Sequence, residues 1–163
     1  MTTLSRPGTT TFVTPSDTEL VATRTFEAPR KRLWEALTQP EHMRQWMLGP
    51  EGWTMPVAEL DLRKGGKWHI GWRGPDGTVM EMRGEFREVD PPSRLVQTES
   101  WGDDWPETLT TQVLYGENGT TTLTCAIRYL SKDARERARA TGMEDGMTKS
   151  YDRLDGYLRI MPK

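Results

Sequence analysis

The sequence predicts an α+β fold in which a curved antiparallel sheet wraps around one long C-terminal helix. The helix is predicted over residues 142–161, where apolar side chains recur at steps of four and three, as on one face of an α-helix: Met143, Met147, Tyr151, Leu154 and Leu158. Most of the chain before it alternates between apolar and polar residues, which is typical of half-buried strands. Short turns rich in glycine and proline join these stretches, so consecutive strands are expected to pair antiparallel.

The N-terminal part predicts a tail followed by one domain. Residues 1–17 are rich in Thr, Ser, Pro and Gly and have no periodicity, which favours a flexible tail. Residues 18–163 then form a single domain, long enough to bury a substantial core. Its first strand is predicted over residues 19–26 and ends before Pro29, because proline cannot extend a strand ladder.

Two short helices are predicted after the first strand. Pro29 and Pro40 suit the first turns of helices that run to about Leu37 and Met47, and a Gly-Pro pair ends the second. A DNA-binding helix–turn–helix is the more specific interpretation of these two helices, but the second helix lacks a basic face. We therefore expect the pair to be a structural connection.

Six further strands complete the predicted sheet. Gly84 lies inside one of them and is interpreted as a bend or bulge of a curved sheet. Asn118-Gly119 is the strongest short signal of a hairpin turn. The predicted strand ranges are 53–62, 67–72, 78–89, 94–101, 107–115 and 120–130.

The last part of the chain predicts two helices. One begins at Lys132, with Ser131 as its N-cap. Gly142 interrupts it before the long C-terminal helix. The polar residues of that long helix fall off its apolar stripe and are expected to face water: Glu144, Lys149, Asp152, Arg153, Asp155 and Arg159.

Composition excludes several function classes. A net charge of −2 gives no electrostatic reason to expect a nucleic-acid partner. No apolar run approaches the roughly 20 residues that span a bilayer, and the start of the chain lacks the pattern of a secretory signal, so we expect a cytoplasmic protein without membrane insertion. One cysteine and two histidines argue against a disulfide or a zinc site. Because phosphate loops, dinucleotide fingerprints and hydrolase elbows are also missing from the sequence, we expect no metal and no cofactor.

Several short motifs carry a family resemblance in their order and spacing, over about residues 19–161. They include Arg24-Thr25-Phe26-Glu27-Ala28-Pro29, Leu33-Trp34-Glu35-Ala36-Leu37-Thr38, Asp61-Leu62-Arg63-Lys64-Gly65-Gly66-Lys67-Trp68, Gly84-Glu85-Phe86-Arg87-Glu88-Val89, Pro91-Pro92-Ser93-Arg94-Leu95-Val96 and Ser150-Tyr151-Asp152-Arg153-Leu154. The chain thus resembles the family of proteins like the C-terminal domain of the activator of heat shock protein 90 ATPase. That family lies within the START-like (Bet v 1-like) helix-grip superfamily called SRPBCC.

The resemblance implies a cavity between the sheet and the C-terminal helix that binds hydrophobic or amphipathic small molecules. It implies no single activity, because the superfamily also contains polyketide cyclases and aromatases, lipid carriers and hormone receptors. The family usually carries a bulky aromatic residue near the position of Met147, so methionine there is expected to loosen or enlarge the pocket.

The candidate ligand-binding residues are those that alternation and helical spacing direct toward such a cavity. Gln97, Glu99 and Tyr151 are the polar ones and could orient a ligand. For Glu99 the simpler expectation is a solvated or salt-bridged residue at the end of a strand. The full set is Trp68, Ile70, Trp72, Met80, Met82, Phe86, Gln97, Glu99, Met143, Met147 and Tyr151.

Other reactive side chains are expected to be structural, and none is assigned a catalytic role. His69 alternates with buried neighbours and so belongs on the outer face of the sheet, and His42 is expected to be exposed on its helix. Asp61 and Arg63 flank a Gly-Gly turn and are predicted to form an ion pair. Cys125 lies in a strand, where an inert buried thiol is expected.

The first functional hypothesis is a protein that binds a hydrophobic or aromatic small molecule. The alternative is an enzyme of the cyclase or aromatase kind in the same cavity, which a carboxylate or tyrosine deep in the cavity would favour. A second alternative is a chaperone-interaction module; an exposed apolar patch would favour that module or a homodimer. The sequence favours binding, because it offers no convincing acid/base pair.

Overall fold

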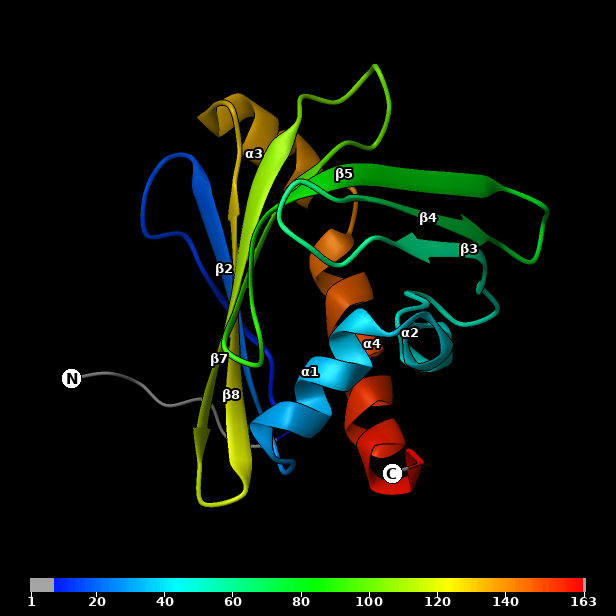
Figure 1. Ribbon diagram of the computed structural model, residues 1–163. Helices are drawn as coiled ribbons and strands as arrows, with labels where there is room; N and C mark the ends of the chain where they lie inside the picture. Colours follow the sequence, from blue (N-terminus) through cyan, green and yellow to red (C-terminus); the bar gives the residue numbers. More distant parts are fainter. Residues whose placement is uncertain (1–7, 163) are drawn as a thin grey trace.

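The computed structural model describes residues 8–162. Its elements, in chain order, are β1 (Thr11–Val13), β2 (Glu19–Phe26), α1 (Arg30–Thr38), α2 (Pro40–Trp46), β3 (Thr54–Leu60), β4 (Lys67–Arg73), β5 (Val79–Asp90), β6 (Arg94–Glu99), β7 (Thr108–Glu117), β8 (Thr120–Arg128), α3 (Lys132–Arg139) and α4 (Met143–Ile160). The strands form one curved antiparallel sheet, and α4 lies in its concave side together with α1 and α2 (Figure 1). The predicted α+β helix-grip architecture is confirmed.

The strand order of the sheet is β1-β2-β8-β7-β6-β5-β4-β3. Consecutive hairpins therefore build the run from β3 to β8, as predicted, while β2 pairs with β8 from the far end of the chain. At the β7–β8 turn, Asn118 and Gly119 have φ angles of 52° and 82°. Positive φ at both positions gives the tight hairpin the twist that antiparallel strands need. The predicted Asn-Gly hairpin is thus confirmed.

β1 corrects the prediction of a flexible tail through residue 17. Thr11 and Val13 pair with Thr23 and Val21 of β2, so this short segment forms an edge strand of the sheet. It has little buried surface of its own, and backbone pairing with β2 holds it in place. Residues 1–7 of the predicted tail lie outside the described residues.

Gly84 is needed for a close contact, and the irregularity in β5 lies elsewhere. The register between β5 and β6 shifts between Phe86 and Glu88. At Gly84, an added Cβ would lie 1.8 Å from the carbonyl oxygen of Thr98 and 2.6 Å from the indole nitrogen of Trp68. The glycine therefore lets β6 and Trp68 approach β5.

The apolar stripe of α4 packs as predicted. Tyr151, Leu154 and Leu158 are buried, and Phe26 of β2 meets the Tyr151 ring edge-on with the ring centroids 5.9 Å apart. At the start of the preceding helix, the Ser131 hydroxyl accepts a hydrogen bond from the Ala134 amide, which confirms the predicted cap. No helix among residues 8–162 is long and apolar enough to cross a membrane.

Of the polar residues of α4 that were expected to face water, two are half-buried against the rest of the fold, Arg153 and Asp155, and Asp152 is exposed as expected but also binds β2. The buried guanidinium of Arg24 on β2 contacts the carboxylates of Asp152 and Asp155, at 2.5 and 3.3 Å. Arg153 donates to the carbonyl oxygen of the last residue of α2 and to that of Gly49 in the segment that follows. Their partners lie more than 100 residues away in sequence. Helical spacing alone therefore cannot reveal these contacts and places all three side chains in water.

Candidate functional site

A cavity of about 800 Å³ lies between the inner face of the sheet, α4 and the segment that follows α2. Alternation along each strand directs every second side chain inward, and α4 contributes the side chains of its apolar stripe. All eleven predicted candidate residues line this cavity: Trp68, Ile70, Trp72, Met80, Met82, Phe86, Gln97, Glu99, Met143, Met147 and Tyr151.

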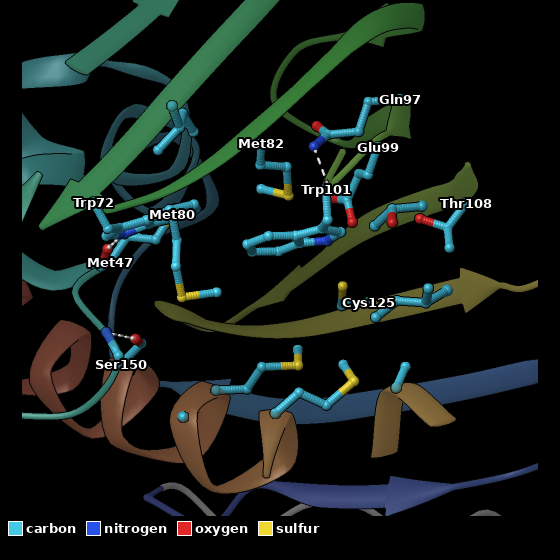
Figure 2. A pocket seen from close by; sticks show the side chains of 18 of the residues that line it. Met47, Trp72, Met80, Met82, Gln97, Glu99, Trp101, Thr108, Cys125 and Ser150 are labelled. Atoms are coloured by element: carbon cyan, nitrogen blue, oxygen red, sulfur yellow. Dashed lines mark hydrogen bonds between the residues drawn. The ribbon is translucent and has the colours of Figure 1, made fainter. Parts of the chain in front are cut away.

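One end of the cavity is aromatic and apolar. The indole nitrogen of Trp72 donates a hydrogen bond to the carbonyl oxygen of Met47 at 2.7 Å, which fixes the ring. The Trp101 ring stacks on Trp72 with centroids 5.5 Å apart and planes 12° apart. Figure 2 shows the thioether of Met80 beside this pair. The arrangement offers a flat, polarisable surface to an apolar ligand.

The mouth of the cavity is also apolar. Val79, Met80 and Leu130 are 57%, 44% and 76% exposed, and all three line the cavity. The loop between β6 and β7 contributes Trp101 and Trp105 to the same wall. An apolar molecule entering from solvent would therefore meet apolar side chains first.

The other end carries four polar side chains, here called the polar cluster: Gln97, Glu99, Thr108 and Thr110. In the β6–β7 register, Gln97 is opposite Thr110 and Glu99 is opposite Thr108. Residues two apart on a strand point to the same face, so both pairs lie side by side on the cavity wall. Gln97 Nε2 donates to Glu99 Oε2 at 3.1 Å, and Figure 2 shows these two with Thr108 on the side away from Trp72.

Two hydroxyls of the polar cluster make no hydrogen bond of ordinary length in the described part of the chain, although one of them interacts with the Glu99 carboxyl closely enough to lower its pKa. They belong to Thr108 and Thr110, which are 8% and 2% exposed. A buried hydroxyl left without a partner costs about 1–3 kcal/mol. The polar cluster therefore has hydrogen-bonding capacity to offer to a bound group.

Glu99 is half-buried on the cavity wall and makes no ion pair within residues 8–162. Glu99 thus ends its strand, as expected, but it is partly withdrawn from water and hydrogen-bonded to Gln97 instead of being salt-bridged. Burial raises the pKa of the Glu99 carboxyl, and the nearby Thr110 hydroxyl and the Gln97 amide offset part of that rise. The neutral acid therefore persists to a higher pH than in an ordinary glutamate.

One thiol and two phenol hydroxyls of the wall also stay protonated. Burial raises the pKa of the Cys125 thiol to about 12, with a further rise from the charge of Glu99. Burial also raises the pKa values of the Tyr129 and Tyr151 hydroxyls. Cys125 is thus the inert buried thiol that the sequence predicts.

The other candidates lie away from the cavity. His69 contacts Glu81 of the neighbouring strand at 3.0 Å on the outer face of the sheet. Asp61 and Arg63 form the predicted ion pair, at 2.9 Å. The expectation for His42 is wrong, because this residue is half-buried and its Nδ1 lies 2.7 Å from the hydroxyl of Tyr157 on α4.

Sequence reasoning missed Thr108 and Thr110 as site residues, as well as Gly146. The alternation of residues 107–115 could have placed the two threonines opposite Gln97 and Glu99. Gly146 lines the cavity from inside α4, and an added Cβ there would meet nothing within 4 Å. Glycine in a helix interior costs about 1 kcal/mol relative to alanine, which is itself a signal of a special position.

Comparisons with known proteins agree with this architecture. A crystal structure of a protein from Rhodobacter sphaeroides is 31% identical, with a TM-score of 0.87 over 94% of this chain and 100% of that one. Proteins from Mycobacterium smegmatis (24% identity, TM-score 0.82, 92% of this chain and 97% of that one) and Nitrosomonas europaea (23%, 0.80, 90% and 97%) share the fold.

No protein of curated function matches the sequence. The family model described as "Activator of Hsp90 ATPase homolog 1-like protein" matches residues 27–159. Because this match covers most of the chain, the protein belongs to the family of Activator of Hsp90 ATPase homolog 1-like proteins.

Proposed function

We propose that the protein binds a hydrophobic or aromatic small molecule in the cavity between the sheet and α4. The observation that carries the proposal is the cavity itself, about 800 Å³ in volume and lined mainly by tryptophan, methionine and aliphatic side chains. This volume lies in the range of small-molecule sites in proteins. A site with a few polar groups in a mostly apolar wall is also the usual composition of such pockets.

The apolar wall can supply the affinity. Burying roughly 300 Å² of apolar ligand surface contributes about 7 kcal/mol, before the costs of association are subtracted. The protein surface that contacts the ligand would be mostly aromatic or thioether, as at the Trp72–Trp101 stack and Met80. After the costs of association are subtracted, millimolar to high-micromolar binding of a compact aromatic molecule is the expected scale, and a larger apolar ligand would bind more tightly.

Filling the cavity from α4 is the sharpest test. Gly146→Leu places a side chain into the cavity where nothing lies within 4 Å of the new Cβ. Gly156→Leu is the matched control, because Gly156 is on the same helix, also has open space around its Cβ and does not line the cavity. Both changes raise helix propensity by about 1 kcal/mol, so neither should unfold α4.

The readout is titration with Nile red, an uncharged apolar dye, followed by native mass spectrometry of ligands that copurify with the protein. We expect the wild type and Gly156→Leu to bind the dye equally, and Gly146→Leu to bind it at least about tenfold more weakly. A wild type that binds neither dye nor copurifying ligand, or a Gly146→Leu variant that binds like the control, would contradict the proposal.

A second candidate function is acid/base catalysis on a ligand in the same cavity. Glu99 favours it, because a carboxyl with a raised pKa beside an enclosed apolar space suits a general acid or base. The test is deuterium exchange at the methyl group of 2-acetylnaphthalene in D₂O, followed by NMR. Catalysis predicts exchange that is faster with wild type than with Glu99→Gln; equal rates would leave binding as the function.

A further inference from the structure

The charge of the cavity wall restricts which ligands fit. Among the described residues that line the cavity, none is a lysine, an arginine or a histidine, and the only ionisable carboxyls are Glu81 and Glu99. Glu81 is half-exposed and paired with His69 on the outer face. Glu99 is therefore the one carboxyl placed to face a ligand, and an anionic ligand would find no counter-charge.

The polar cluster can bind an uncharged group from several directions. The amide of buried Gln97 is joined to Glu99, and the two threonine hydroxyls stand opposite them on β7. Hydroxyls both donate and accept, and a protonated carboxyl does the same. A ligand hydroxyl, ketone or amide can therefore be satisfied in more than one orientation.

A cationic ligand is less suited to this site than an uncharged one. An ammonium group would need an ionised Glu99 as its partner. Moving both charges into an apolar cavity costs several kcal/mol per ion, which the attraction between them must offset. Tyr151, Tyr129 and Cys125 around Glu99 stay neutral and offer no further negative charge. An uncharged ligand makes its hydrogen bonds without ionisation of any of these groups.

We propose that the polar cluster selects uncharged ligands that carry one hydrogen-bonding group on an apolar body, and that the cavity excludes carboxylates, because none of its described lining residues is a cation and the ionised form of Glu99 repels them. This inference rests on the proposed binding function and specifies its ligand class. The hydrogen-bonding group lies against Gln97, Glu99, Thr108 and Thr110, and the apolar body lies toward the Trp72–Trp101 stack. Long-chain or aromatic alcohols, ketones and amides belong to the class, whereas fatty acids and aromatic acids do not.

Three probes with the same apolar body test the charge selection. They are 2-naphthylmethanol, 2-naphthoate and 2-naphthylmethylamine, each titrated into the wild-type protein by isothermal calorimetry at pH 7.5. We expect the alcohol to bind at least tenfold more tightly than the carboxylate and more tightly than the amine. Equal affinities for all three would overturn the selection while binding itself stands, and an amine that binds tightest would show that Glu99 acts as a counter-ion.

Two variants assign the effect to a residue. Glu99→Gln keeps an acceptor for Gln97 and removes the ionisable group, so we expect naphthoate affinity to rise at least fivefold and alcohol affinity to change less than threefold. Glu81→Gln is the matched control, since it removes the outer carboxyl that also lines the cavity; it should leave the alcohol-to-carboxylate ratio unchanged. A wild type that binds none of the three probes would contradict the binding function together with this inference.

Discussion

Arg24 Nη1 lies 2.5 Å from Asp152 Oδ1 and so ties the core face of β2 to α4 across 128 positions of the chain. The same guanidinium reaches Asp155 and the hydroxyl of Thr10, although Arg24 is only 2% exposed. Its neighbours on that face of β2 are apolar. The guanidinium is therefore a buried charge whose carboxylate partners lie on α4. The contact adds to the packing of Tyr151, Leu154 and Leu158 in holding α4, which forms one wall of the cavity.

We predict that Arg24→Ala lowers the free energy of unfolding by about 2–4 kcal/mol, because it removes a buried ion pair and leaves a packing defect. Asp152→Asn should cost less than about 1 kcal/mol, since Asp152 is 58% exposed and an exposed pair is weak. Urea unfolding of the three proteins measures both values. A larger loss in Asp152→Asn than in Arg24→Ala would contradict this account.

Glu99 predicts a dependence of stability on pH. Its pKa in the folded state is raised above the ordinary value of 4.5, so between these two values the folded protein holds a proton that the unfolded chain releases. The contribution of Glu99 to stability is therefore fully present below about pH 4.5 and is lost as pH rises through the folded pKa. Glu99→Gln removes this loss and should stabilise the protein at pH 8 by about 1 kcal/mol.

The measurement is the difference in unfolding free energy between wild type and Glu99→Gln, from pH 4 to pH 8. The difference isolates Glu99 from the other titrating groups. It should grow with pH in favour of the variant, and a flat difference would show that Glu99 keeps its ordinary pKa in the fold.

Cys125 should resist thiol reagents in the native state. With a pKa of about 12, its thiolate is scarce at pH 8, and the thiolate is the reactive form. We expect Ellman's reagent to label the native protein at least ~1,000-fold more slowly than the protein unfolded in urea. Labelling at the same rate in both states would contradict the burial of this residue.

Arg137 on α3 should control how fast ligands exchange. Its guanidinium lies 3.9 Å from the centre of the Trp105 ring and donates to the carbonyl oxygen of Asp104 at 2.8 Å. These contacts hold the loop that brings Trp101 and Trp105 to the cavity wall. Because an exposed cation–π contact is worth about 0.5–1 kcal/mol, Arg137→Ala should speed Nile red dissociation roughly two- to fivefold.

Stopped-flow displacement of the dye measures this rate. Arg137→Lys keeps the positive charge and should lie between the wild type and the alanine variant. An alanine variant with an unchanged dissociation rate would mean that the loop does not limit exchange.

Local patterns predict the elements of this fold well, and long-range partners explain the errors. The stripe from Met143 to Leu158 and the alternation of Trp68, Ile70 and Trp72 depend only on neighbours in sequence, and the structure confirms both. β1 is too short for a periodic pattern and is held by pairing with β2. Asp155 has the spacing of a solvated helix residue until Arg24, 131 positions away, is placed beside it.

The candidate site divides in the same way. Its wall could be predicted because alternation and helical spacing direct Phe86, Gln97 and Met147 inward. The state of Glu99 could not, because it depends on what surrounds the end of β6 in three dimensions. The opposing threonines became visible as a group only once the β6–β7 register was known.

The pairing of β2 with β8 also has a consequence for the newly made chain. A ribosome that adds about 5–20 residues per second completes β2 several seconds before it completes the strand that pairs with it. Throughout that time β2 lacks its partner strand β8, and its apolar residues are not yet buried: Leu20, Ala22 and Phe26. The cavity closes last of all, because α4 follows every strand of the sheet, so the wall of the cavity is complete only after α4 has been made.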